Sequence, residues 1–159
     1  MLDRDIYSAE NCSLARTLAI VGEKWTMLIL RESINGATRF QEFQAVLGCP
    51  RNLLASRLDT LVQQRIFERV AYQEPRHRTR HRYVLTGKGA ALLPGLIALT
   101  HWGDQYLADP DGPATIIRHR GCGGELRTSL QCGDHDHEVD PRDVDLEPGP
   151  GALKLKDTA

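Results

Sequence analysis

Apolar residues recur at helical spacing through the first part of the chain. Between residues 13 and 34 they return every three or four positions, which predicts helical structure. Gly22 is expected to divide this stretch into two helices, and Asn35-Gly36 to end the second, because glycine suits the position just past a helix C-terminus. The apolar positions are Leu14, Leu18, Val21, Trp25, Leu28 and Ile29.

The next two elements predict a helix-turn-helix. A short helix is expected from Thr38, with Gln41 completing a capping box three residues later, and Gly48 ends it. Pro50 then begins another helix, at a position where proline is well tolerated. Two helices joined by such a tight turn form the helix-turn-helix motif of many DNA-binding proteins.

A densely basic segment follows, between two strand-like stretches at 66–72 and 83–85. It reads Arg76-His77-Arg78-Thr79-Arg80-His81-Arg82, with four arginines and two histidines in seven positions. Such charge suits contact with a polyanion, since each neutralised phosphate releases counterions. For the segment alone, a solvated arginine-rich loop is an equal alternative. After a helix-turn-helix, the order strand, basic turn, strand predicts a winged helix.

The second helix of the motif carries the candidate base-reading side chains. Polar residues on an exposed helix face are common in any protein, so it is their combination with the basic hairpin that indicates DNA. Near the hairpin tip, Arg78 and Arg80 are expected to reach phosphates or the minor groove. The full set of predicted DNA-binding residues is Arg51, Asn52, Ser56, Arg57, Arg76, Arg78, Arg80 and Arg82.

A long helix is expected from a Thr86 cap to about Leu107, with a kink or break at Pro94. Its apolar band is wider than one small domain needs. The band therefore predicts a homodimer, and a symmetric dimer would place two reading heads on the half-sites of double-stranded DNA.

Charge divides the chain into two parts. The whole chain has 159 residues, of which 41% are hydrophobic, and a net charge of −1. Residues 1–107 carry 14 basic and 10 acidic side chains, whereas residues 108–159 carry 6 and 11. We therefore predict a DNA-binding and dimerisation domain over 1–107 and a C-terminal extension over 108–159. After Val139 the extension is acidic, rich in Pro and Gly, and expected to be poorly ordered.

The predicted fold class is mainly α with a small β-hairpin wing, plus a small C-terminal β-rich or irregular appendage. No apolar stretch reaches the roughly 18 residues that cross a bilayer, and the charged N-terminus lacks the apolar region of a signal peptide. We expect a cytoplasmic protein with no membrane partner. Structural disulfides are rare in that compartment, so the four cysteines are read as thiols or metal ligands.

Several ordered motifs resemble the HxlR-type transcriptional regulators over about residues 10–107. They are Cys12, Gly22-Glu23-Lys24-Trp25-Thr26, Arg39-Phe40-Gln41-Glu42-Phe43, Leu54-x-x-Arg57-Leu58, Tyr83-Val84-Leu85-Thr86-x-x-Gly89 and Trp102-Gly103. The resemblance implies a winged-helix homodimer, with the N-terminal and long C-terminal helices at the interface, and a role in transcription, often repression. Two departures are Cys49-Pro50, where the family usually has a Ser cap, and a longer, more basic wing.

Cysteine and histidine suggest two further sites. Cys12 matches the cysteine that several members of the resembled family use as a redox or electrophile sensor, and a helix N-terminus favours the thiolate. The alternative is a cysteine that only caps or packs. In the extension, His119, Cys122, Cys132 and His135 have zinc-like spacing. Longer family members carry a similar zinc-ribbon-like segment, although the expected second Cys-x-x-Cys is absent. No cofactor is required, and a bound zinc would be structural.

The leading hypothesis is a sequence-specific DNA-binding regulator, expected to be a repressor that reads an inverted repeat and responds to oxidants or electrophiles through Cys12. An alternative signal is a small-molecule effector, which would bind between the dimer helices and control DNA binding instead of Cys12. The alternative is a metal- or redox-responsive sensor that acts mainly through a protein partner. Catalytic spacing of Ser, His, Asp or Glu is not recognisable, so the sequence does not predict an enzyme.

Overall fold

The computed structural model describes residues 7–8, 10–73 and 79–155. It forms two compact units. The winged unit spans Arg16–Leu96, and the C-terminal unit contains the described residues before Arg16 and those from Ile97 on. The division between them falls within the last long helix, and the predicted domain boundary after residue 107 stays a prediction. The predicted fold class is confirmed, because the structure is mainly helical with one long two-stranded antiparallel hairpin.

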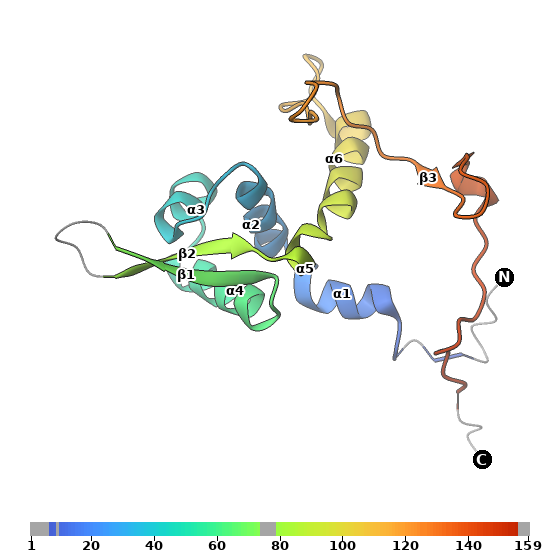
Figure 1. Cartoon of the computed structure of the whole chain (residues 1–159), viewed down its shortest axis with the longest axis horizontal. Coiled ribbons are helices and arrows are strands. Elements are labelled where there is room, and N and C mark those ends of the chain that lie inside the picture. The colour runs from blue at the N-terminus through green and yellow to red at the C-terminus, as the bar shows by residue number, and fades with distance from the viewer. Residues whose placement is uncertain (1–6, 9, 74–78, 156–159) are drawn as a thin grey trace. The chain divides into compact units, whose positions relative to one another are not determined.

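The helices follow the predicted apolar pattern (Figure 1). Gly22 separates the first two helices, as expected, and Gly36 has a φ of 100°, the left-handed conformation that suits a residue after a helix. The elements up to the long helix are α1 Ser13–Val21, α2 Lys24–Ile34, α3 Phe40–Leu47, α4 Arg51–Gln63, β1 Phe67–Tyr72, β2 Arg80–Leu85, α5 Gly87–Ala90 and α6 Leu93–Leu107.

The start of α3 differs from the expectation. The helix begins at Phe40, with Arg39 as its N-cap residue, and Glu42 takes the place predicted for Gln41. The Glu42 carboxylate accepts hydrogen bonds from the backbone N–H groups of Thr38, at 2.7 Å, and Arg39, at 2.9 Å. These bonds, above all the one from Thr38, hold the pKa of Glu42 below its usual range. A carboxylate satisfies the free amides of a first helical turn better than an amide side chain.

The second strand begins earlier than predicted, at Arg80 instead of Tyr83. Antiparallel pairing runs from Phe67 opposite Leu85 to Tyr72 opposite Arg80, so the end of the basic segment belongs to the hairpin itself. The backbone before α3 joins the other edge of β2. There the Tyr83 N–H donates to the Thr38 carbonyl at 2.7 Å. The wing is therefore hydrogen-bonded to the helix-turn-helix.

The core of the winged unit lies between the hairpin and α2, α3 and α4. Phe43, Phe67 and Tyr83 pack together, with ring centroids 6.3–6.4 Å apart. The buried hydrophobic residues are Val21, Ile29, Leu30, Phe43, Cys49, Leu54, Leu58, Leu61, Ile66, Phe67 and Tyr83. Every one of them belongs to the winged unit.

The predicted long helix is broken, as Pro94 led us to expect. Thr86 caps the first piece, because its Oγ1 accepts a hydrogen bond from the Gly89 N–H at 3.1 Å. Helix α5 ends at Ala90, and α6 begins at Leu93 with Pro94 as its second residue. The break allows proline to occupy a first helical turn, where its missing N–H has no partner to lose.

The C-terminal unit has short β elements, as predicted. β3, Leu130–Gln131, pairs with β4, Glu138–Val139, and a short 3₁₀ helix covers Pro141–Asp143. A separate turn brings Ile117 against Leu126, whose N–H donates to the Ile117 carbonyl at 2.9 Å. None of the described residues from Ile97 to Leu155 is buried. In the parts of the chain that the structure covers, no helix is long and apolar enough to cross a membrane.

Candidate nucleic-acid interface

Helix α4 presents its predicted base-reading residues unequally. Leu54, Leu58 and Leu61 form its buried face. Arg51, Asn52 and Ser56 are exposed near the helix N-terminus, on the side left free by that packing. A guanidinium, an amide and a hydroxyl are side chains that form hydrogen bonds to base edges or phosphates.

The turn between α3 and α4 is held by its own backbone. Gly48 has a φ of 62°, a left-handed conformation that glycine adopts without strain. The Gln44 side-chain amide donates to the Cys49 carbonyl at 2.6 Å. The Cys49 thiol is buried, at 1% exposure. These contacts fix the direction in which α4 leaves the turn.

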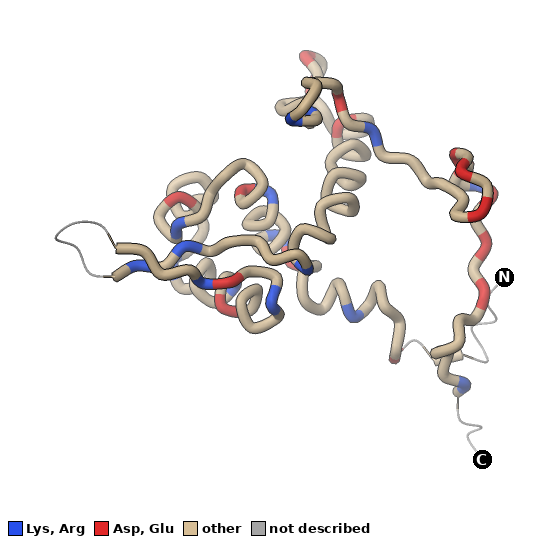
Figure 2. The backbone as a smooth tube through the Cα atoms, in the orientation of Figure 1, with Lys and Arg blue, Asp and Glu red and all other residues tan. Residues whose placement is uncertain are grey.

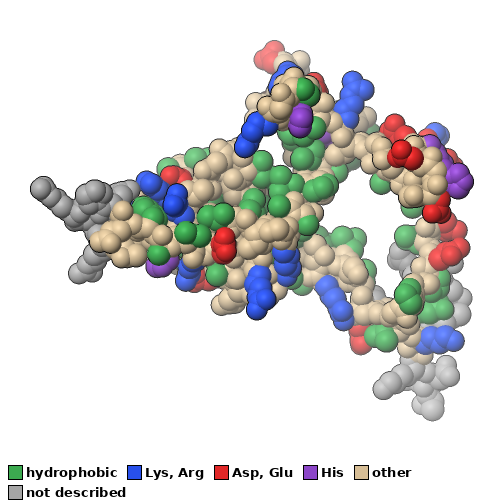
Figure 3. All heavy atoms as spheres, in the orientation of Figure 1, with side chains coloured by type: hydrophobic (Ala, Val, Ile, Leu, Met, Phe, Trp, Pro, Cys, Tyr) green, Lys and Arg blue, Asp and Glu red, His purple; other side chains and the backbone are tan. Residues whose placement is uncertain are grey.

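The described wing arginines lie on β2. Arg80 and Arg82 are exposed, alternate with His81 along the strand, and form no ion pair with any described residue. Basic side chains accompany the hairpin, whereas acidic side chains accompany the segment after α6 (Figure 2). The surface view shows basic groups beside the described part of the wing (Figure 3). The other two predicted wing residues, Arg76 and Arg78, lie outside the described residues.

Arg39 is a basic residue of this surface that the sequence reasoning missed. Its guanidinium carbon lies over the Tyr72 ring, 4.8 Å from the centroid, and that of Arg82 lies 5.5 Å from the same centroid. Such contacts hold a guanidinium in place, and the Arg39 Nε also lies 3.8 Å from the Glu42 Oε1. Arg39 and Arg82 also form a β-bridge. Arg39 lies just before α3, in the segment that pairs with the wing. Its position immediately before a predicted helix was the signal available in the sequence.

A groove of about 380 Å³ joins α4 to the wing within the winged unit. Arg51 lines it from the start of α4, where its guanidinium lies 5.2 Å from the centroid of the Phe40 ring. Arg39, Tyr72 and Arg80 line it from the hairpin side. The structure therefore brings together the predicted Arg51 and Arg80 and the newly found Arg39 at one concave, positively charged surface. Such a surface suits a phosphate backbone.

Arg57 is placed differently from the other α4 candidates. Its guanidinium forms an ion pair with Glu23, the residue before α2, and its side chain is only 25% exposed. The Nε atom of Arg57 is buried and has no hydrogen-bond partner among the described residues. Arg57 thus links α4 to the start of α2 in the unbound chain, and its predicted role in reading bases stays a prediction.

The base of the hairpin is attached to α4 by a second ion pair, between Arg69 on β1 and Asp59 on α4. The Arg69 guanidinium carbon also lies 5.8 Å from the centroid of the Tyr83 ring. These contacts couple the orientation of the wing to that of the helix.

The cysteine and histidine candidates lie elsewhere. Cys12 is an exposed free thiol directly before α1. In the C-terminal unit the His119 Nδ1 lies 3.2 Å from the Cys122 Sγ, and the Cys132 Sγ lies 3.9 Å from the His135 Nδ1. Within the described residues, however, no three such side chains come together as a metal site. Zinc binding stays a prediction.

A helix-turn-helix joined to a hairpin with exposed arginines defines a winged-helix DNA-binding protein. Residues 20–111 match the HxlR-like helix-turn-helix family. The chain belongs to this family of transcriptional regulators, which confirms the resemblance noted in its motifs and the expectation that it is not an enzyme.

Individual relatives agree with this assignment. The chain is 43% identical to the HTH-type transcriptional regulator Rv3095 of Mycobacterium tuberculosis, over 89% of each chain. It is similar to the crystal structure of PA1607, a candidate transcription factor, with a TM-score of 0.78 and 34% identity over 88% of this chain and 96% of the other. The redox regulator HypR in its oxidised form matches with a TM-score of 0.56 and 26% identity, over 62% of this chain and 100% of its own.

The lengths of these matches separate two kinds of relative. The alignment with Rv3095 covers 142 residues. Only 107 residues precede the C-terminal extension, so the alignment must include part of it. HypR, by contrast, is matched over its whole length by less than two thirds of this chain. The extension is thus shared at least in part with Rv3095.

Proposed function

We propose that this chain is a homodimeric repressor that reads an inverted repeat with α4 and the basic wing, and that an oxidant or electrophile releases it from DNA through Cys12. The observation that carries the DNA-reading part is the groove described above. Arg51 and Arg80 line it without an ion-pair partner among the described residues, and Asn52 and Ser56 lie exposed near Arg51. Unpaired arginines in a concave surface are electrostatically favourable only when an anion is bound.

Exposed apolar stripes support the homodimer. On α6, Leu99, Trp102 and Tyr106 recur at three- and four-residue spacing and are 59%, 56% and 61% exposed. On α1, Leu14 and Leu18 are 66% and 52% exposed. Large apolar side chains in such stripes mark protein interfaces, and a second copy of the chain supplies a matching surface.

The redox part of the proposal is supported by the exposure of Cys12 and by its position before a helix. An exposed thiol is accessible to oxidants and electrophiles, which react with its thiolate form. Family relatives include HypR, which is a redox regulator solved in reduced and oxidised forms. Oxidation at Cys12 would alter the start of α1, one of the two helices with an exposed apolar stripe.

The experiment is selection of genomic fragments with the full-length protein, followed by titration of the recovered sequence with and without diamide. We expect a short inverted repeat, bound by the reduced protein and released on oxidation. Cys12→Ser should bind the repeat and ignore diamide, whereas Cys122→Ser, a second exposed thiol, should respond like the wild type. If the wild type and both variants bind the repeat and diamide releases none of them, the redox part of the proposal alone is removed.

The wing is tested on the same recovered sequence. Arg80→Ala combined with Arg82→Ala should lower the magnitude of the slope of log affinity against log salt by about four, because the proposed dimer loses two arginines from each protomer and each arginine that neutralises a phosphate contributes about 0.9. An unchanged slope would exclude both residues from phosphate contact. Recovery of no sequence at all would favour a sensor that acts through a protein partner.

A further inference from the structure

A pocket in the C-terminal unit has no role in the proposed DNA contacts. It lies between one face of α6 and the segment 113–128, and its volume is about 630 Å³. Ligand pockets for small organic molecules commonly measure roughly 300–1,000 Å³. The pocket is therefore large enough for a molecule with one or two rings.

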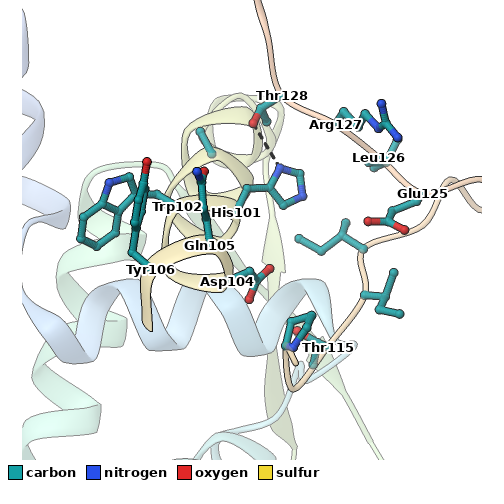
Figure 4. Close-up of a pocket in the computed structure, with 14 residues that line it drawn as sticks. His101, Trp102, Asp104, Gln105, Tyr106, Thr115, Glu125, Leu126, Arg127 and Thr128 are labelled. Carbon is teal, nitrogen blue, oxygen red and sulfur yellow. Dashed lines mark hydrogen bonds between the residues drawn. The ribbon is translucent and has the colours of Figure 1, made fainter. Parts of the chain in front are cut away.

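The first wall of the pocket is a face of α6. Ala98, His101 and Gln105 recur at three- and four-residue spacing and so lie on one side of the helix, with Asp104 beside them. Figure 4 shows the His101 and Asp104 side chains on the opposite side of α6 from the Trp102 ring. Trp102 and Tyr106 of the aromatic stripe assigned to the dimer also line the pocket, so the pocket and the stripe share part of the helix surface.

The second wall is a turn of the extension that is fastened to itself and to α6. Its two arms are joined by the Leu126–Ile117 hydrogen bond and by another from the His119 N–H to the Gly124 carbonyl, at 2.7 Å. The His101 Nδ1 lies within hydrogen-bond distance of the Thr128 Oγ1, at 3.1 Å. This contact closes one end of the pocket, as the dashed line in Figure 4 shows.

The charges around the pocket favour a cation. Asp104 and Glu125 both line it, one from each wall, and neither forms an ion pair with a described residue. In Figure 4 the side chain of Arg127, the one guanidinium in the lining, extends away from Asp104. Ile116, Ile117 and Leu126 add apolar surface. Two carboxylates beside aliphatic side chains complement an ammonium or amidinium group that carries an apolar body.

We propose that the pocket between α6 and the 113–128 segment binds a small amphipathic organic cation, with Asp104 and Glu125 holding its charged group, and that this ligand changes DNA affinity. The coupling rests on the proposed function, because α6 also carries the stripe assigned to the dimer. If DNA and the ligand each bind one arrangement of α6 more tightly than another, each must change the affinity of the protein for the other by the same factor.

Binding is tested by calorimetry on the full-length protein. The probes are phenylbutylammonium, benzamidinium and benzyltrimethylammonium, each compared with a carboxylate of similar size, phenylbutyrate or benzoate. We expect at least one cation to bind with a dissociation constant at least tenfold below that of its matched carboxylate. If no cation binds more tightly than its carboxylate, the proposal is overturned.

Variants locate the binding site. Asp104→Asn combined with Glu125→Gln should weaken binding of the cation at least tenfold with little change in side-chain shape. Asp134→Asn, an acidic residue of the same unit that does not line the pocket, should leave the affinity unchanged. Ala98→Trp, which fills the pocket without removing a charge, should also abolish binding. Equal affinity of the first variant and the wild type would refute the assigned charges.

DNA binding is measured separately, so that the two proposals can fail separately. On the selected operator, the bound cation should change the affinity of the wild type at least threefold and leave that of the Asp104→Asn/Glu125→Gln variant unchanged. Cation binding by calorimetry with no effect on operator affinity would overturn the coupling. If the protein binds the cation but no operator is recovered, the proposed ligand pocket is retained and the proposed repressor function is removed.

Discussion

The two units of this chain are ordered by different means. The winged unit has a continuous set of buried apolar side chains, built around three packed aromatic rings. The described part of the C-terminal unit, from Ile97 to Leu155, has no buried residue, and short backbone pairings such as Leu130 opposite Val139 hold its shape. Buried apolar area is the main source of folding free energy, so the first unit can stabilise itself.

The difference indicates how each unit can respond to binding. A segment without a buried core gains a large share of its stability from whatever binds it, because a ligand that prefers the ordered form shifts the equilibrium toward that form. The winged unit needs no such contribution. A regulator built in this way keeps its DNA-reading surface constant and places its adjustable part in the extension.

The largest expected contrast comes from removing one apolar side chain in each unit. Phe43→Ala should lower the free energy of unfolding of the winged unit by about 3–5 kcal/mol, because Phe43 is completely buried against Phe67 and Tyr83. Leu126→Ala, in the wall of the C-terminal pocket, should cost that unit less than about 1 kcal/mol. Urea unfolding followed by hydrogen exchange measures both, and equal costs would contradict the comparison.

A DNA contact provides the second contrast. Arg57→Ala should weaken binding to the selected operator by about 1–3 kcal/mol and binding to random DNA by less, provided that Arg57 leaves Glu23 to read a base. Arg127→Ala, in the C-terminal unit, should leave both affinities unchanged. Equal losses on operator and random DNA for Arg57→Ala would show that the residue only fixes α4 against Glu23. Fluorescence anisotropy at one salt concentration measures the four affinities.

The third contrast concerns two carboxylates whose pKa values lie below their usual ranges. Glu42 has a lowered pKa because Thr38 and Arg39 donate to it, so its contribution is complete above the ordinary glutamate range and is lost as the pH falls through the lowered value. Glu42→Gln should cost about 0.5–1 kcal/mol near neutral pH and remove this part of the acid dependence.

Asp140 is the matched carboxylate of the C-terminal unit. Its pKa is lowered by hydrogen bonds from the Arg142 side chain and backbone, but the ion pair lies at the surface, with the Arg142 side chain 88% exposed and that of Asp140 40% exposed. Asp140→Asn should therefore leave the melting temperature unchanged at every pH, because exposed ion pairs are screened. Thermal melts between acid and neutral pH test both substitutions, and a shift for Asp140→Asn equal to that for Glu42→Gln would contradict this assignment.

The smallest effect is expected from metal removal. None of the residues predicted to bind zinc belongs to the winged unit; they are His119, Cys122, Cys132 and His135. Treatment with EDTA should therefore leave the unfolding of the winged unit unchanged, whatever its effect on exchange in the C-terminal unit. A lowered melting temperature of the winged unit after chelation would show that the two units share one folding transition.

Features that depend on the local backbone could be predicted from the sequence. The division at Gly22, the helix end at Gly36, the turn at Gly48 and the break before Pro94 all follow from which conformations glycine and proline allow. The buried residues of α4, Leu54, Leu58 and Leu61, recur at four- and three-residue spacing, which is also a local pattern. These features do not depend on which distant segment packs against them.

Features that depend on distant contacts could not be predicted. The basic run contains no strand-like pattern, yet β2 begins at Arg80 because Tyr72 offers a paired backbone opposite it. Arg57 was grouped with the exposed residues of α4 because its partner, Glu23, lies before another helix. The segment 113–128 has no regular periodicity, so the pocket that it forms with α6 left no signal in the sequence.

The backbone connection between the wing and the residues before α3 has a consequence for the operator. Thr38, before α3, is hydrogen-bonded to Tyr83, and Asp59 of α4 is paired with Arg69, so the hairpin is joined to the helix-turn-helix at two points. Their separation along the DNA axis is therefore fixed within each protomer. A base pair inserted between the bases under α4 and those under the wing should abolish recognition of that half-site, because the two elements cannot move apart to follow the lengthened DNA.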